Sequence, residues 1–332
     1  MNKKSKKRKK QEKEIKKIFL LLLILFTGVF LASSTYAWFT VNRIVYLDSL
    51  KVRVEAQGGI EISADAKTFK SYVSSEDLIQ APTTYKTSIN QLPVKLEPVS
   101  TAGGLENGKL MLYYGSVTNN INGDYVLNAS REIESSNNAD GMFIAFDIFL
   151  KSNKDTKLYL TPESGARYVG DKLPGIENAT RIAFVVLGNT VSNANPDFVQ
   201  NLNNATLNDV YIWEPNYDVH NEYGIKHAQD VYGIAVGKEN NQPVSYDGIA
   251  SEVKNVYVNQ ANQVNYPNLF RKVNVSYLTP ADFINNKEIF SINSGITKIR
   301  LYAWLEGQDV DCENNSAVGN LDFKFQFSTN PS

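Results

Sequence analysis

Alternating apolar and polar positions predict β-strands along much of the chain. The clearest case lies near the end, where every second residue from Leu321 to Phe327 is apolar and the residues between them are polar. Alternation with the same period of two is present at 50–56, 142–150 and 299–305. A period of two indicates strands that bury one face. The stretch from Arg181 to Leu187 is apolar at nearly every position and predicts a strand that is buried on both faces.

Helical patterns are few. Residues 196–207 predict one short helix with Asn195 as its N-cap. Its inward-facing side chains would be Phe198, Leu202 and Leu207. Stretches rich in Asn, Ser and Gly predict surface loops at 117–124, 135–141, 189–195 and 238–247.

Many short strands separated by turn-rich spacers favour an all-β fold. We expect a β-sandwich of jelly-roll or Greek-key type with long loops. The stretch from about 190 to 265 is the most irregular part of the sequence, and it predicts an insertion on that sandwich.

The first 37 residues predict export from the cytoplasm. Ten Lys/Arg lie within residues 1–17, and the segment 18–42 that follows has no charge and begins with an apolar run. About 20 apolar residues suffice for a helix to cross a bilayer, and basic residues before it favour a cytoplasmic N-terminus. The small residues that end at Ala37 also fit a signal peptide, with cleavage after Ala37. Residues 1–37 are therefore either a signal peptide or an uncleaved membrane anchor, and 38–332 form the extracytoplasmic domain.

Charge separates this domain from its leader. The leader holds ten of the 34 Lys/Arg and two of the 35 Asp/Glu, so the remaining 295 residues carry 24 against 33 and a net charge of −9. An acidic domain repels nucleic acid, so the basic N-terminus is interpreted as a topology signal and not as a nucleic-acid site. The single cysteine, Cys312, excludes an intrachain disulfide framework. We expect an extracellular or cell-surface location, with signal peptidase as one partner and the membrane as another before or without cleavage.

The sequence offers no recognisable catalytic motif and no cofactor-binding motif. It contains no phosphate-binding loop, no dinucleotide fingerprint and no Gly-x-Ser-x-Gly elbow. Its only histidines, His220 and His227, are seven residues apart, and surface positions are expected for both. We therefore predict that the protein is not an enzyme, and we assign no catalytic residue.

An acidic loop at 306–313 is the strongest chemical pattern. Its carboxylates at Asp309, Asp311 and Glu313 could supply oxygen ligands to Ca²⁺. The spacing does not match an EF-hand, because no Gly stands at the sixth position and no Glu at the twelfth. The alternative is a solvated acidic turn without a metal. Cys312 lies in the same loop, where a lone cysteine is expected to be inert.

The stretch 34–40, Ser-Thr-Tyr-Ala-Trp-Phe-Thr, resembles exported Gram-positive proteins of the TasA/camelysin type. Residues 50–62, which include Gly58 and Gly59, are similar to the first strand pair after the cleavage site of those proteins. The resemblance covers about 35 residues. It implies removal of the leader by a signal peptidase of the SipW kind. It also implies a jelly-roll subunit of an extracellular (biofilm) matrix fibre.

Three classes of function follow from the sequence. The leading hypothesis is a secreted or cell-surface structural protein, a matrix or fibre subunit that associates with itself. The second is a membrane-anchored β-sandwich module that binds a carbohydrate or another ligand. That module would present aromatic side chains in one groove, and the aromatic residues considered for it are Tyr113, Tyr114, Tyr211, Trp213, Tyr217 and Tyr223. The third is a secreted hydrolase whose catalytic residues the sequence does not reveal.

The segment 38–50 is too apolar for a free, solvated tail. It contains Trp38, Phe39 and Val41 at its start and more apolar residues up to Leu47. One alternative is that the chain's own sandwich buries it. The other is that it adds as a strand to an open sheet edge of a neighbouring subunit, which would propagate as a filament.

Overall fold

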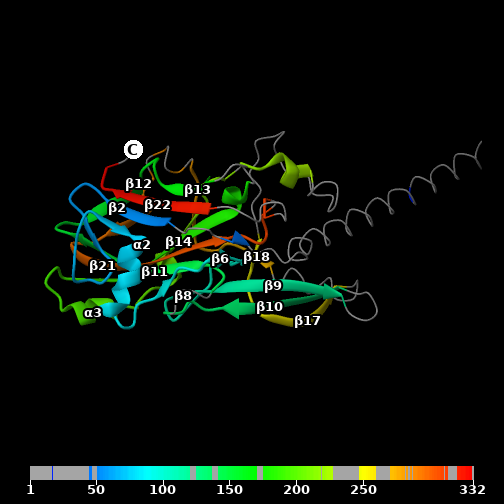
Figure 1. Ribbon diagram of the computed structural model, residues 1–332, viewed down its shortest axis with the longest axis horizontal. Coiled ribbons are helices and arrows are strands. Elements are labelled where there is room, and N and C mark those ends of the chain that lie inside the picture. The colour runs from blue at the N-terminus through cyan, green and yellow to red at the C-terminus, as the bar shows by residue number, and fades with distance from the viewer. Residues whose placement is uncertain are drawn as a thin grey trace, which may run out of the picture.

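The computed structural model shows a mainly β protein (Figure 1). The predicted leader helix and the cleavage position at Ala37 lie outside the residues that the structure describes. Within the described part, no helix is both long enough and apolar enough to span a bilayer. The described residues are 17, 45–46, 51–119, 125–136, 141–169, 175–217, 219–226, 247–258, 270–280, 282, 285, 287–309, 311–312 and 320–330.

Two main sheets form the body of the described structure. The larger sheet has the strand order β19–β15–β14–β21–β11–β3, and β5 also pairs with β11. Its strands are β3 (Glu61–Ser63), β5 (Asn90–Gln91), β11 (Ile144–Ser152), β14 (Thr180–Thr190), β15 (Val210–Trp213), β19 (Ser276–Leu278) and β21 (Gly295–Leu305). Neighbouring strands are antiparallel except for β15 and β19, which are parallel.

The smaller main sheet has the order β20–β12–β22–β2–β4, and β13 also pairs with β22. Its strands are β2 (Lys51–Ala56), β4 (Tyr72–Ser74), β12 (Thr156–Leu160), β13 (Gly165–Val169), β20 (Phe290–Ile292) and β22 (Asn320–Ser328). The strand β2 runs parallel to β22 and antiparallel to β4. The first strand of the body therefore lies beside its last one.

The two main sheets face each other across one hydrophobic core. The predicted apolar faces of β11 and β22 both point into it, and so do Ile299 and Leu301 of β21. The Phe184 ring of β14 contacts Phe325 and Phe327 of β22, with centroids 6.3 and 5.7 Å apart. Aromatic pairs at these separations add to the stabilisation that burial provides. The period-two predictions for these strands are confirmed.

The second face of the larger sheet is also covered. A second cluster of buried side chains joins Tyr302 and Trp304 of β21 to Leu110 and Leu112. Leu112 begins β9 (Leu112–Asn119), which pairs with β10 (Tyr125–Glu132). The strand β17 (Val253–Val258) completes this three-stranded sheet, which lies below the larger sheet in Figure 1. The loop predicted at 117–124 is therefore wrong in its first three residues, which belong to β9.

The strand β14 extends beyond its prediction. It was expected to end at Leu187, but its pairing with β21 continues to Thr190. The register shifts between Val186 and Gly188, and Gly188 has a φ of 144°. Glycine adopts such a φ without steric cost, so the strand passes through an irregularity and does not stop there.

The predicted helix at 196–207 is much shorter in the structure. Its helical part, α3, spans Pro196–Gln200, and the Asn195 side chain accepts the N–H of Asp197 at 2.8 Å, as expected for an N-cap. Phe198 is 59% exposed, so its inward prediction is wrong, whereas Val199 and Leu202 are buried. Leu207 is exposed as well. Because the helix has only five residues, its buried side is defined by Val199 and by Leu202, which follows the helix and lies three residues further along the chain.

The remaining elements are short. The helix α2 (Ser75–Gln80) begins with a capping box between Ser74 and Asp77. Three two-stranded pairs complete the described strands: β1 (Val45–Tyr46) with β6 (Lys95–Leu96), β7 (Leu105–Glu106) with β8 (Lys109–Leu110), and β16 (Asp247–Ile249) with β18 (Phe270–Lys272). The 3₁₀ turns are η2 (Ala81–Thr83), η3 (Ile176–Ala179) and η4 (Leu207–Asp209).

Two sequence predictions meet this topology only in part. The strand β15 lies inside the insertion predicted at 190–265, yet it pairs with β14 within the larger sheet. The segment 38–50 is described only at Val45 and Tyr46, whose backbone pairs with Leu96 and Lys95 of the same chain. The rest of that segment lies outside the described residues.

A buried ionic network crosses the second face of the larger sheet. Asp147 of β11 lies opposite Arg300 of β21 and binds its guanidinium through two contacts, at 2.7 and 3.1 Å. Arg300 also contacts Glu134 at 3.0 Å, while Asp147 receives the Tyr85 hydroxyl at 2.7 Å and the Lys298 ammonium at 3.4 Å. We call these five residues the Asp147 network. Arg300 was expected on an alternating polar face, but a third layer of structure covers it.

Candidate functional site

A second group of buried charges lies at one end of the larger sheet. It forms where β14 begins and where β15 and β21 end, so residues distant in sequence meet there. We call it the Arg181 cluster, and its members are Arg181, Glu214, His220, Glu306, Asp309 and Asp311. Their side chains are buried, and His220, the most accessible of them, has a side chain only 9% exposed.

Arg181 is the cation at the centre of this cluster. It is the second residue of β14 and lies opposite Trp304 of β21. Its guanidinium is 2.6 Å from both Glu214 and Asp309. It also donates to the backbone carbonyls of Asn178 and Thr180, at 3.0 and 3.1 Å. A buried guanidinium needs such partners, because an unpaired charge in the interior is costly.

Local hydrogen bonds fold the acidic loop inward after β21. The N–H of Asp311 donates to the Asp309 carboxylate at 2.8 Å, and the N–H of Gln308 donates to the Glu306 carboxylate at 3.1 Å. The N–H of Cys312 closes the turn on the carbonyl of Asp309 at 3.1 Å. The solvated acidic turn considered from the sequence is therefore wrong for these residues. Short-range bonds to backbone N–H groups allow the carboxylates to be buried.

His220 joins the cluster from the segment that follows β15. Its Nδ1 is 3.0 Å from the Asp311 carboxylate, and the N–H of Asn221 donates to the other oxygen of Asp311 at 2.8 Å. The surface position expected for His220 is wrong, because the chain after β15 turns over the end of the sheet. His227 lies outside the described residues. No pattern in the sequence predicts this contact, which joins positions 91 residues apart.

Burial controls the protonation of the cluster. It raises the pKa of Glu306 to about 8 and, against the nearby charge of Arg181, that of Glu214 to about 7. Burial also raises the pKa of Asp311. Burial alone would lower the pKa of His220, but the bond to Asp311 and the surrounding carboxylates outweigh it and raise the pKa. Four carboxylates thus share one guanidinium and one imidazole, and protonation of Glu306 and in part of Glu214 limits the buried negative charge at pH 7.

The predicted metal ligands are brought together only in part. Asp309 and Asp311 lie side by side, and one ligand atom from each, together with one ring nitrogen of His220, all fall within 4.8 Å of one another. Glu313, the third ligand expected from the sequence, lies outside the described residues. The donor set that the structure describes is therefore one nitrogen and two carboxylates.

Comparison with known proteins assigns no family to this geometry. No family model matches the chain, and neither a curated protein nor a solved structure matches it. The chemistry of the cluster therefore follows from its own atoms. Its side chains are buried and contact one another.

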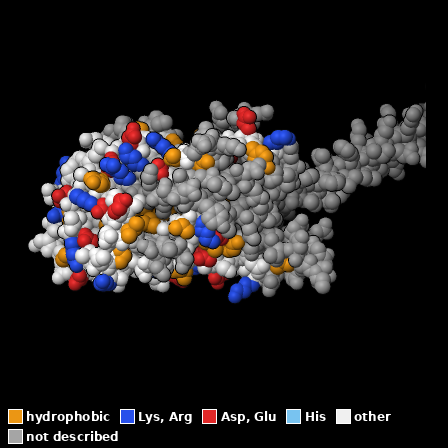
Figure 2. All heavy atoms as spheres, viewed as in Figure 1, with side chains coloured by type: hydrophobic (Ala, Val, Ile, Leu, Met, Phe, Trp, Pro, Cys, Tyr) orange, Lys and Arg blue, Asp and Glu red, His pale blue; other side chains and the backbone are white. Residues whose placement is uncertain are grey.

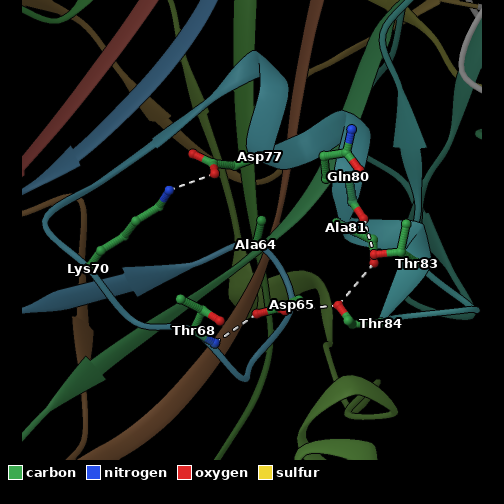
Figure 3. A pocket seen from close by; sticks show the side chains of 9 residues that line it. All are labelled: Ala64, Asp65, Thr68, Lys70, Asp77, Gln80, Ala81, Thr83 and Thr84. Carbon is green, nitrogen blue, oxygen red and sulfur yellow. Dashed lines mark hydrogen bonds and ion pairs between the residues drawn. The ribbon is translucent and has the colours of Figure 1, made fainter.

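A shallow pocket of about 200 Å³ lies beside α2 (Figure 3). The Asp65 carboxylate at its floor accepts the Thr84 hydroxyl and the N–H of Thr68, each at 2.9 Å. On the opposite wall, Lys70 pairs with Asp77 at 2.6 Å. These polar groups pair with one another within the lining of the pocket. We therefore assign no ligand to it.

A larger groove of about 650 Å³ opens where the last described strands of the two main sheets meet. The strand β19 ends the order of the larger sheet, and β20 ends that of the smaller one. The groove is lined by Tyr211 and Ser276 from the first and by Phe290 and Ser291 from the second. The Tyr211 and Phe290 rings, 5.4 Å apart, pack against each other there. We call it the edge groove.

The aromatic residues considered for a ligand groove do not form one exposed surface. Tyr113 and Trp213 are buried, and Tyr211 packs against Phe290. Tyr217 packs against Tyr277, with ring centroids 6.4 Å apart. Most of these rings are therefore packing residues. Charged side chains of both signs are interspersed over the described part of the surface in Figure 2.

Proposed function

We propose that this protein is a structural component of a bacterial cell surface or extracellular matrix and not an enzyme. It is exported through the cytoplasmic membrane, and a signal peptidase processes its leader. Its subunits associate by donating the apolar segment 38–44 to a neighbour. We further infer a jelly-roll or Greek-key arrangement of the two main sheets. The basic leader, the acidic domain and the stretch that resembles TasA/camelysin proteins support this proposal.

The edge groove is the observation that carries the proposal. The two strands that line it, β19 and β20, each have a partner on one side only within the described residues. An edge strand offers a row of unpaired N–H and C=O groups to an added strand. Apolar side chains of an added strand would find Tyr211 and Phe290 at the mouth of the core. Main-chain bonds would give affinity and side-chain pockets would give specificity.

The length of the donated segment fits this geometry. Val45 and Tyr46 pair with their own chain, so residues 38–44 are the part that can leave the subunit. Seven extended residues span at most about 25 Å, at roughly 3.3–3.6 Å each. That length exceeds the three residues of β20, so one segment can pair along the whole edge. Because the donor and acceptor surfaces differ, the contact does not close on itself and propagates as a filament.

Truncation tests the donor. The domain 38–332 should form multimers at high concentration in analytical ultracentrifugation, and filaments by electron microscopy. The domain 45–332 should melt at a similar temperature and remain monomeric. A domain 38–332 that stays monomeric at high concentration contradicts the proposal. Loss of folding in 45–332 would mean that the segment belongs to its own core.

Cross-linking tests the acceptor. Ser291 of β20 is exposed, and the single natural cysteine, Cys312, is buried. A mixture of V41C and S291C subunits should form a disulfide between chains, with neighbouring positions covering the pairing register. A matched variant with cysteine at the exposed Asp197, on α3, should not cross-link to V41C. Equal cross-linking at both places would remove the edge groove as the acceptor.

A further inference from the structure

We propose that His220, Asp309 and Asp311 bind one divalent transition-metal ion of the Zn²⁺ class at the end of the larger sheet. This site is independent of strand donation. It differs from the Ca²⁺ site expected from the sequence in both its ligands and its ion.

The positions of the donor atoms fit a common ion. Zinc ligands lie about 2.0–2.2 Å from the metal, so two of them are at most about 4.4 Å apart. The three candidate donors are within 4.8 Å of one another, and the Nδ1 of His220 is 3.0 Å from Asp311. Because two ligands of a tetrahedral zinc ion are about 3.4 Å apart, side-chain shifts of up to about 1 Å would close the site.

The site contains ligating capacity that the protein itself does not use. His220 contacts Asp311 through Nδ1 only; its second ring nitrogen, Nε2, is buried and has no hydrogen-bond partner among the described residues, and the side chain is 9% exposed. Unsatisfied buried polar groups in a folded protein call for an explanation such as an ordered water or an ion.

Surrounding groups already hold the two carboxylates in place. Asp309 receives a backbone N–H and the Arg181 guanidinium, and Asp311 receives the N–H of Asn221. Partners of this kind orient metal-ligating carboxylates in known sites. Arg181 would remain as a partner of Asp309 and would not need to leave the cluster.

The donor set selects the class of ion. Calcium takes six to eight oxygen ligands, whereas an imidazole nitrogen with carboxylates suits zinc and its neighbours. His220 is therefore the residue that distinguishes the two alternatives. Glu313 is not required for this assignment.

Metal binding is tested on the mature domain 38–332 after chelation. Native mass spectrometry should show one Zn²⁺ per chain, and the melting temperature should rise on addition of Zn²⁺ but not of Ca²⁺. Mn²⁺, added separately, should bind more weakly. Calorimetry should show at least about a 100-fold weaker Zn²⁺ affinity for H220A and for D311N. The variant H227A, which changes the only other histidine, should bind like the wild type.

Three results would overturn the proposal. The first is a wild-type domain that binds no Zn²⁺ and melts at the same temperature with and without it. The second is an affinity that H220A leaves unchanged. The third is a sulfur ligand in the X-ray absorption spectrum of the zinc-loaded wild type, a measurement that does not depend on the variants folding. Nitrogen and oxygen ligands support the site, and a sulfur ligand from Cys312 excludes it.

Discussion

Substituting Arg300 by methionine should destabilise the domain more than any surface charge substitution. The Arg300 side chain is 7% exposed and forms contacts of 2.7–3.1 Å with Asp147 and Glu134. Removing one partner of a buried ion pair leaves an uncompensated charge, which costs about 3–5 kcal/mol. For a domain of this size, that loss lowers the melting temperature by roughly 6–10 °C. The matched control is R53M, since Arg53 pairs with Glu55 at 2.6 Å but is 57% exposed, and its change should stay below about 1 kcal/mol.

The same network predicts a pH dependence. Burial alone would raise the pKa of Asp147, but the charges of Arg300 and Lys298 outweigh it and hold the pKa below the ordinary value of 3.8. A carboxylate whose pKa is lowered by folding stabilises the protein above its unfolded pKa, and this contribution disappears as the pH falls through the folded pKa. The cost of D147N should therefore be complete at pH 7 and should shrink progressively below about pH 4.

Urea unfolding of the wild type, both single variants and the double variant D147N/R300M measures this coupling at each pH. The double variant should lose less stability than the two single variants together, by roughly 1–3 kcal/mol at pH 7. A coupling energy near zero, or a cost of D147N that is the same at pH 7 and pH 3, would refute the reasoning.

Other predictions concern single packing and turn positions. F325A, in the core between the main sheets, should cost about 3–5 kcal/mol in urea unfolding, whereas F198A on the exposed side of α3 should change stability by less than about 0.5 kcal/mol. G248A should lower the melting temperature strongly, because its added Cβ would lie 1.8 Å from the backbone oxygen of Thr101. N195A should cost about 1 kcal/mol through loss of the N-cap of α3, and N195S should restore most of it.

Sequence periodicity predicted which residues share a face, but not what covers each face. The strands β11, β21 and β22 have the expected alternation, and their apolar sets meet in one core. The other face of β21 was expected to be polar, yet Tyr302 and Trp304 are fully buried. A period of two reports only that two faces differ. The third layer, built from segments such as 110–112 and 199–202, leaves no trace in that period.

The sequence predicted only the acidic-loop residues of the candidate site. Asp309 and Asp311 stood out because acidic residues cluster in one loop, but a charge pattern does not distinguish a solvated turn from a buried one. Arg181 was predicted only as the first residue of a buried strand, and no pattern singled out Glu214. His220 reaches Asp311 because the chain after β15 turns toward the acidic loop, and only tertiary structure determines that turn.

Buried charges on the second face also define the strand register. In the observed pairing, Asp147 lies opposite Arg300. A slip of two residues would keep every apolar side chain of the core face inward, so the hydrophobic core alone discriminates weakly against it. The same slip would place Arg300 opposite Ala145 or Phe149 and would leave its charge buried without a carboxylate across the strand pair. Because an uncompensated buried charge costs several kcal/mol, the Asp147 network selects the native register where hydrophobic packing does not.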